Sequence, residues 1–151
     1  AVNELRDRTQ VSAQVYRRQM DSRLCIAAAE PAAGLRDSVP VGALLSMQAG
    51  SAAQVLTAWA PEDERRRALR VAAFTADDLE TTRQRGWAHS LAQREPGVAS
   101  LSAPIRDDLG DVVAAISLSG PVDRLSRPTK AQIGALLNAA ARLSLGDKPQ
   151  P

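Results

Sequence analysis

Serine residues are the side chains of this sequence whose spacing could do chemistry. Between Val98 and Pro121, two apolar runs flank the acidic turn DDLGD, which predicts a β-hairpin. Strand periodicity places small and hydroxyl-bearing residues on one face of it: Val98, Ser100, Ser102, Val113, Ala115, Ser117 and Ser119. With residues 107–110 as the loop, we expect Ser100 to lie opposite Ser117 and Val98 opposite Ser119. Such hydroxyls could hydrogen-bond a small polar ligand.

The other face of this hairpin is apolar and is predicted to be core: Ala99, Leu101, Ala103, Ile105, Val112, Ala114, Ile116 and Leu118. The serine-bearing face lacks, over most of its length, the Lys, Glu, Arg and Gln side chains that are typical of an exposed sheet. Because buried hydroxyls need hydrogen-bond partners, two interpretations stay open: a solvent-facing surface, or a shallow cavity that holds water or a polar ligand.

Catalytic and metal-binding groups are scarce. His89 is the only histidine, and strand parity points it away from Ser90, whereas an activated serine needs its base within ~3 Å. Cys25 and His89 offer no metal-ligand spacing, and no paired carboxylates share a predicted face. We therefore expect no enzyme, no metal site and no cofactor. The single Cys25 is predicted to be a small core residue in a strand.

A second stretch, SMQAGSAAQVL at residues 46–56, has no charge and little bulk, and it leads into a predicted helix. Three interpretations compete: tight helix packing, a phosphate cradle, and a site where backbone amides meet a small ligand. A phosphate-binding P-loop is excluded because the Gly-Lys-Ser/Thr motif is missing. Tight packing and ligand binding remain as alternatives.

The elements that must position these residues change in type along the chain. Polarity patterns and helix-start and helix-stop residues define them. They are strands over residues 9–18, 22–30 and 35–42, helices over 49–59, 61–71 and 75–86, a strand near 87–91, the hairpin, and a helix over 128–146. Thr75 and Asp78 predict a capping box, and Gly86 a helix end. This order indicates an α/β (α+β) fold with a largely antiparallel sheet.

Composition sets the class of protein. The 151 residues suit one domain, with 44% hydrophobic and 24% charged residues, and no apolar run approaches the ~18 residues of a membrane span. The net charge of +2 comes from basic residues scattered among acids, and aromatic residues make up only 3%, so a nucleic-acid surface is disfavoured. A single cysteine and a charged N-terminus favour the cytoplasm.

The segment from residue 83 to 125, RQRGWAHSLAQREPGVASLSAPIRDDLGDVVAAISLSGPVDRL, closely resembles the C-terminal effector domain of IclR-family bacterial transcription regulators. The family shows a Gly-aromatic-Ala start, a Glu, Gly-Val, Ala-Pro-Ile with an acidic turn, and Ala-Ala-(Ile/Leu)-Ser-(Val/Ile)-Ser-Gly-Pro. The resemblance extends over nearly the whole chain. It implies a GAF-like effector-binding domain over residues 1–146, a disordered tail over 147–151, and a winged helix-turn-helix DNA-binding domain that has no counterpart in this sequence.

The resemblance also implies the site residues and partners. The effector, a small organic acid or an aromatic metabolite, would contact Leu45, Ser51, Ala52, Ser90, Val98, Ser100, Ser117 and Ser119. Operator DNA would be bound only through the N-terminal domain, and the chain would form a homodimer or homotetramer away from any membrane. Ala53 and Gln54 stand where the family usually has Gly-Lys, which changes the loop. The alternative is a ligand-free GAF-like dimerisation module.

Overall fold

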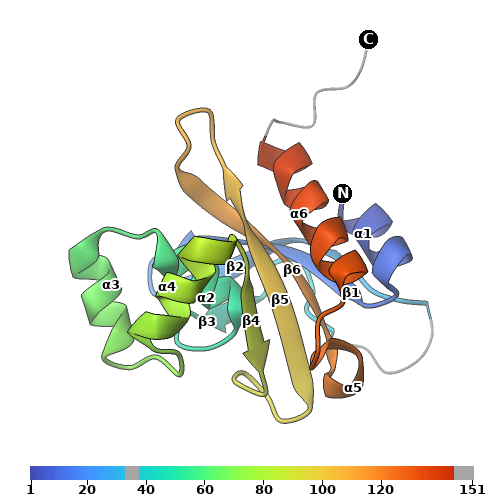
Figure 1. The fold of residues 1–151 in the computed structure, drawn as a ribbon, viewed down its shortest axis with the longest axis horizontal. Helices are drawn as coiled ribbons and strands as arrows, with labels where there is room; N and C mark the ends of the chain where they lie inside the picture. Colours follow the sequence, from blue (N-terminus) through green and yellow to red (C-terminus); the bar gives the residue numbers. More distant parts are fainter. Residues whose placement is uncertain (33–37, 145–151) are drawn as a thin grey trace.

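The computed structural model describes residues 1–32 and 38–144 (Figure 1). The third predicted strand lies partly outside these residues, and so do the predicted helix end at Gly146 and the tail over 147–151. The elements are α1 (Val2–Thr9), β1 (Ser12–Gln19), β2 (Ser22–Ala29), β3 (Leu44–Ser46), α2 (Ser51–Ala58), α3 (Glu62–Leu69), α4 (Ala76–Arg85), β4 (Ala88–Leu91), β5 (Val98–Arg106), β6 (Val112–Pro121), α5 (Val122–Leu125) and α6 (Lys130–Ser144).

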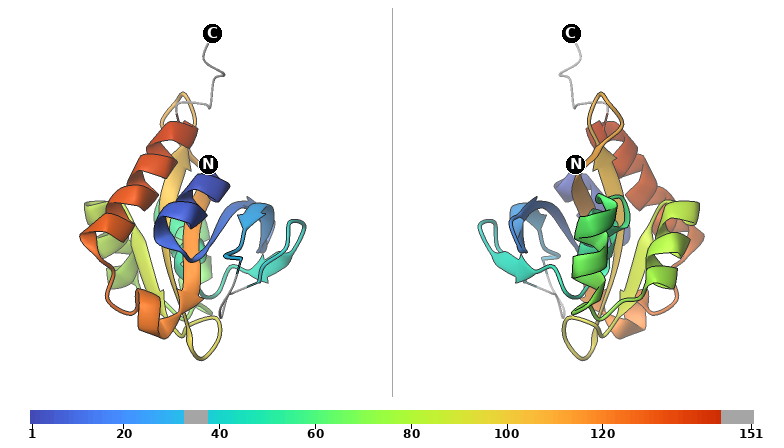
Figure 2. Two further views of the ribbon diagram at one scale, coloured as in Figure 1. Left: turned by 90° about the vertical axis from the view of Figure 1, so that its right-hand side faces the viewer. Right: turned by 90° about the vertical axis from the view of Figure 1, so that its left-hand side faces the viewer.

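One sheet of six strands organises these elements, in the order β3-β2-β1-β6-β5-β4, and every neighbouring pair is antiparallel. Helices α1 and α6 cover one face of the sheet, and α2 and α4 cover the other (Figures 1 and 2). The prediction of an α+β fold with a largely antiparallel sheet is confirmed. None of the helices in the described ranges is long and apolar enough to cross a membrane.

Each face of the sheet carries its own core. Under α1 and α6, the alternating residues of β1, β5 and β6 pack with Leu5 and Leu136. Under α2 and α4, Tyr16, Cys25 and Ala115 pack with the apolar side chains of the two helices. Cys25 is fully buried, as predicted, and this burial raises the pKa of its thiol.

Helix α1 was not predicted, and the third strand has other bounds than predicted. The charged N-terminal segment forms α1, a short helix whose only buried residue is Leu5, so its sequence carries no recognisable apolar stripe. The third strand is Leu44–Ser46 and not residues 35–42; the described part of that range, from Ser38 to Gly42, contains no strand. Pro40, which cannot donate to a ladder, accounts for the difference.

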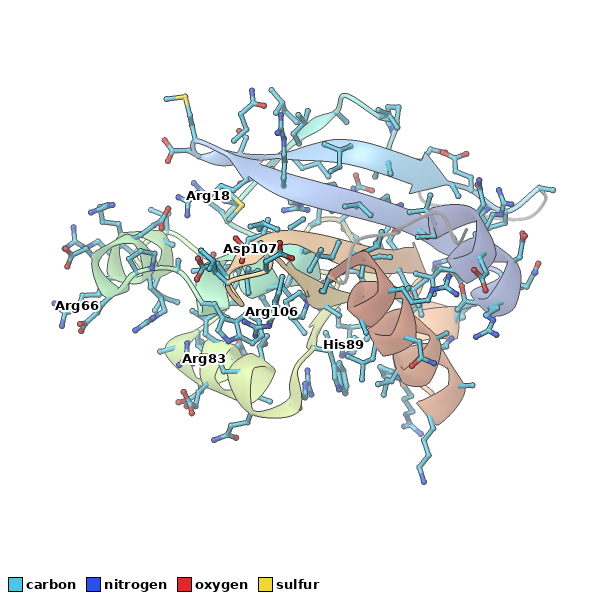
Figure 3. All side chains as sticks on the ribbon, turned by 90° about the horizontal axis from the view of Figure 1, so that it is seen from above. Arg18, Arg66, Arg83, His89, Arg106 and Asp107 are labelled. Atoms are coloured by element: carbon cyan, nitrogen blue, oxygen red, sulfur yellow. The ribbon has the colours of Figure 1, made fainter. Side chains whose placement is uncertain are left out.

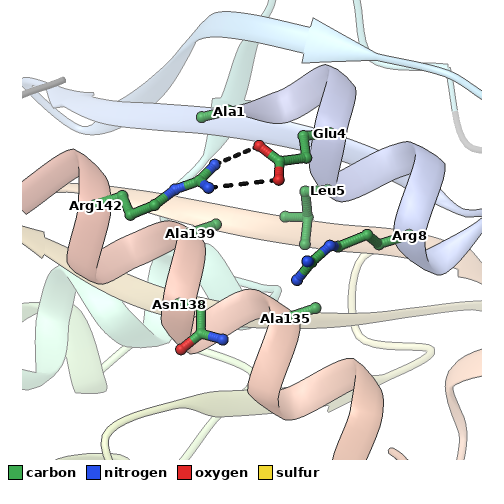
Figure 4. Close-up of a pocket in the computed structure, with 8 residues that line it drawn as sticks. All are labelled: Ala1, Glu4, Leu5, Arg8, Ala135, Asn138, Ala139 and Arg142. Carbon is green, nitrogen blue, oxygen red and sulfur yellow. Dashed lines mark hydrogen bonds and ion pairs between the residues drawn. The ribbon is translucent and has the colours of Figure 1, made fainter. Parts of the chain in front are cut away.

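Helix α1 is fastened to α6 at its exposed side (Figure 4). The guanidinium of Arg142 donates to the carboxylate of Glu4 at 2.5 Å, beside the buried Leu5. The hydrogen bond and charge of Arg142 hold the pKa of Glu4 below its ordinary value. A small hollow of about 20 Å³ lies between the helices, and both partners of the ion pair line it together with Leu5 and Ala139.

Helix α4 begins with the predicted capping box. The hydroxyl of Thr75 accepts from the amide of Asp78 at 3.2 Å, the carboxylate of Asp78 accepts from the amide of Thr75 at 2.8 Å, and Gly86 ends the helix with a left-handed φ of 87°. We expect Thr75→Ala to lower the free energy of unfolding by about 0.5–2 kcal/mol, measured by urea denaturation. Thr81→Ala, an exposed position of the same helix, is the control and should cost nothing; equal losses in both would contradict the capping role.

Candidate functional site

Serine hydroxyls from four elements form one hydrogen-bonded chain between the sheet and α2. Ser90 of β4 contacts Ser100 of β5 at 2.7 Å, and Ser100 contacts Ser51 of α2 at 2.6 Å. Ser51 also contacts Ser102 at 2.7 Å, and Ser102 contacts Ser117 of β6 at 2.5 Å. The predicted serine face therefore points under α2 and away from bulk water. It is a polar layer in the interior of the domain.

The pairing of β5 with β6 differs by two residues from the prediction. Ser100 lies opposite Ser119, Ser102 opposite Ser117, and Val98 opposite Pro121. The loop spans residues 107–111, which adds one residue, and a bulge beside Ile105 adds another on β6. Because the total shift is even, the serines keep their face. The prediction for Val112 was wrong. The bulge moves this residue to the α2 side of the sheet, where it packs in the core under α2 and α4, whereas the sequence placed it with Ile105 and Ile116 on the opposite face.

Gln14 continues this polar layer and was missed by sequence reasoning. Its side-chain amide donates to the Ser119 hydroxyl at 3.0 Å and accepts from it at 3.1 Å. Strand parity already placed Ser12 and Gln14 on one face, but only the pairing of β1 with β6 brings them beside the serines. Ser12 lies opposite Ser119, and its buried hydroxyl has no hydrogen-bond partner among the described residues.

The N-terminus of α2 points into the same region. Gln54 is the first residue to donate along the helix, to the carbonyl of Gly50 at 3.1 Å, so the preceding amides have no acceptor within the helix. The amide of Ser51 meets the Ser100 hydroxyl at 3.4 Å. All eight residues of α2 are buried, because the helix packs between the sheet and α4. The small residues at 46–56 thus allow α2 to pack closely. They also leave the first amides of the helix accessible beside the serine hydroxyls.

Arg23 fixes the loop that leads to α2, and it too was missed. Its side chain is buried, lies over the ring of Tyr16 at 5.1 Å, and donates to the carbonyls of Ser46 and Ala49, the latter at 2.8 Å. Arg23 shares strand parity with the core residue Cys25, which was the available signal. An arginine in a strand is more often exposed, and the sequence alone does not identify its carbonyl partners.

A cavity of about 20 Å³ lies where these elements meet, enough for about one water molecule. Its lining residues are Gln14, Tyr16, Arg23, Gly50, Ser51, Ala52, Arg94, Ser100, Ser117 and Ser119. Five predicted site residues are thus brought together, and Ser90 stands behind them on Ser100. Two predicted site residues do not line the cavity. Leu45 of β3 pairs with Arg23 of β2 and packs against the core, and Val98 lies at the end of β5 opposite Pro121.

His89 lies on the opposite side of β4 from the serines. Its Nε2 atom is 2.8 Å from the carbonyl oxygen of Leu125 (Figure 3 labels the residue), while the hydroxyl of the neighbouring Ser90 is bonded to Ser100. The parity prediction for this pair is therefore confirmed. In the described part of the chain, no group of three or more His, Cys, Asp or Glu residues could hold a metal ion. The cavity offers hydrogen bonds and positive charge, without a base beside a nucleophile.

The fold is an antiparallel α+β domain with a buried polar layer, and the family model of the bacterial transcriptional regulator IclR C-terminal domain matches residues 1–145. The chain belongs to the IclR family and corresponds to its C-terminal domain. Among curated proteins it is similar to the HTH-type transcriptional regulator BhcR of Paracoccus denitrificans, with 33% identity over 86% of this chain and 52% of that protein. It is also similar to the transcriptional repressor IclR of Escherichia coli K12, with 30% identity over 72% and 44%. Both of these relatives are transcription regulators.

Solved structures of this family have the same fold as this chain. A transcriptional regulator of the IclR family from Rhodococcus sp. has a TM-score of 0.84 and 30% identity, covering 95% of this chain and 60% of that one. The C-terminal domain of a transcriptional regulator from Vibrio cholerae has a TM-score of 0.81 and 26% identity, covering 93% and 90%. The chain spans about half the length of the curated relatives it matches.

Proposed function

We propose that this domain senses a small polar metabolite in the cavity under α2 and so controls the DNA binding of a transcription regulator. One observation carries the proposal: serine hydroxyls of β5 and β6 and the N-terminal end of α2 line the same cavity. Helix-start amides that have no acceptor within the helix, together with the positive helix end, favour a carboxylate, and hydroxyls can hold its remaining polar groups.

The chemistry of the lining favours a small organic acid over an aromatic metabolite. Serine, glutamine and arginine side chains dominate the lining, and Tyr16 is its one aromatic residue among those described. A space of about 20 Å³ is smaller than the acid itself, so binding must move side chains such as Arg94 from the β4–β5 loop. A bulkier aromatic ring would have to separate α2 from the sheet, where all of α2 is buried.

Linkage supplies the expected mechanism. The effector binds one arrangement of the regulator better and shifts its population, which changes the placement of two DNA-reading domains. Operator DNA is bound by the N-terminal domain, the regulator is a homodimer or homotetramer, and it works in the cytoplasm. Strand β1 offers a physical path, because Gln14 contacts Ser119 at the cavity and α1 directly precedes this strand.

Thermal denaturation with a panel of two- to five-carbon carboxylates tests the proposal. A ligand at 100 times its Kd adds about 2.7 kcal/mol, which corresponds to a rise in Tm of about 5–10 °C for a domain of this size. The amide of each active acid is the matched control and should give a clearly smaller shift. Silence across the acids and across a set of aromatic metabolites would reject the sensor function.

Calorimetry on serine variants then tests the site. With an acid from that panel that binds, Ser117→Ala and Ser119→Ala are each expected to weaken affinity about tenfold, because each removes a hydroxyl at the cavity wall. Ser126→Ala, which lies outside the cavity lining, should bind like the parent. Parental affinity in both cavity variants would remove the serines from the site.

The second candidate function is a ligand-free dimerisation module. The serine hydroxyls bond chiefly to one another and to Gln14, which is also how a purely structural polar layer would be satisfied. Such a module would self-associate and show no Tm response to any panel member. A concentration-dependent Tm together with a silent panel would favour this function over sensing.

A further inference from the structure

The side chain of Gln93 caps the start of α2 from another part of the chain. Its Oε1 atom accepts from the amide of Gly50 at 3.1 Å and from the side-chain amide of Gln54 at 3.3 Å. The N-cap residue of α2 is Gly50, which has no side chain to fill this role itself. The polar group that meets the helix start therefore comes from the loop between β4 and β5, residues 92–97.

This loop is suited to withdraw the cap. Ala92, directly before Gln93, has φ 55°, a left-handed conformation that is unfavourable for a residue with a Cβ atom. Four of the six loop residues are exposed, so the half-buried Gln93 side chain can turn to water. Gln54 keeps a second acceptor, the carbonyl of His89 at 3.3 Å. Withdrawal of Gln93 thus leaves the Gly50 amide to be satisfied by another acceptor.

We propose that Gln93 is a built-in competitor of the effector: its side-chain carbonyl holds the Gly50 amide until the carboxylate of an acid takes that amide in its place. The inference rests on the sensor function proposed above and adds a specificity-determining residue to it. A neutral ligand carbonyl would make the same hydrogen bond as Gln93 and gain nothing, whereas a carboxylate makes a stronger, charge-assisted bond at the positive helix end. Arg23 and Arg94 also line this cavity, and Glu95 pairs with Arg94 at 3.2 Å, so the charge beside the exchange point is positive on balance.

Gln93→Glu tests the contact without any ligand. The substitution keeps the accepting oxygen and adds the charge of an acid, so Tm is expected to rise by about 1–4 °C at neutral pH. The helix start should hold the pKa of the new carboxyl below its ordinary value, so the gain is present at neutral pH and is lost as the pH falls through that lowered pKa. Gln48→Glu places the same charge on an exposed residue just before Gly50 and is the control, with a clearly smaller rise. Equal Tm values in the two variants would overturn the proposal.

NMR titration with acetate, lactate and succinate tests the exchange itself. Removal of the competitor in Gln93→Ala is expected to tighten binding about two- to tenfold, and the tethered carboxylate of Gln93→Glu to weaken it about tenfold. A merely structural residue would not give these opposite changes. An acid that binds the parent and Gln93→Ala with the same Kd would overturn the exchange and leave the sensor function standing. If neither protein binds any of these acids, the exchange falls together with the proposed acid sensor.

Discussion

Replacing Gly50 by alanine is expected to lower the free energy of unfolding by about 1–3 kcal/mol and to misplace the start of α2. Gly50 has φ 98° and ψ 160°, a region of backbone space that is essentially restricted to glycine. A Cβ atom there would lie 3.1 Å from Nη2 of Arg23. The guanidinium of Arg23 cannot easily move, because it donates to the carbonyls of Ser46 and Ala49. Urea denaturation measures the loss, and the acid panel measures the effect on binding.

Gly134→Ala is the control for Gly50→Ala. Gly134 lies inside α6 in ordinary helical backbone, and a Cβ atom there meets no other atom within 4 Å. Alanine at this position should stabilise the protein by about 0.5–1 kcal/mol, since glycine loses more conformational freedom in a helix. A Gly50→Ala protein as stable as the Gly134→Ala protein would show that the approach of Arg23 to the α2 start is not constrained as described.

Leu136→Ala is expected to lower the free energy of unfolding by about 2–5 kcal/mol, the largest effect of a single truncation considered for this domain. Leu136 is 0% exposed and joins α6 to the core beneath it, so truncation leaves a cavity between helix and sheet. Chemical denaturation measures the change. Leu109→Ala removes the same atoms from a leucine that is 85% exposed in the β5–β6 loop and should change stability by less than about 0.5 kcal/mol. Equal losses would contradict the packing of α6.

The serine face could be predicted because a strand has a side-chain period of two, which does not depend on distant contacts. The same local logic predicted the capping box at Thr75, the helix end at Gly86 and the orientation of His89. The exact pairing of Ser100 could not be predicted in this way. A longer loop and one bulged residue moved its partner from Ser117 to Ser119, and neither has a strong sequence signal.

The rest of the candidate site depends on which strands become neighbours. Gln14 reaches Ser119 only because β1 pairs with β6 across more than a hundred residues of sequence. Arg23 reaches the cavity only because the loop before α2 folds back over β2 and presents two carbonyls to its guanidinium. Periodicity within a segment contains no information on either contact. The α2 start was predicted as a candidate ligand site, and the structure adds the groups that surround it.

The most direct test of the central claim is a ¹H–¹⁵N NMR titration of the assigned domain with acetate, lactate, succinate and benzoate. If the cavity under α2 is the sensing site, a binding acid should shift the amide signals of Ser51 and Ala52 most, because these groups line the cavity at the helix start. The signals of Ser117 and Ser119 should follow with the same Kd. Saturable binding that leaves all four signals in place, or shifts confined to another surface, would contradict the account.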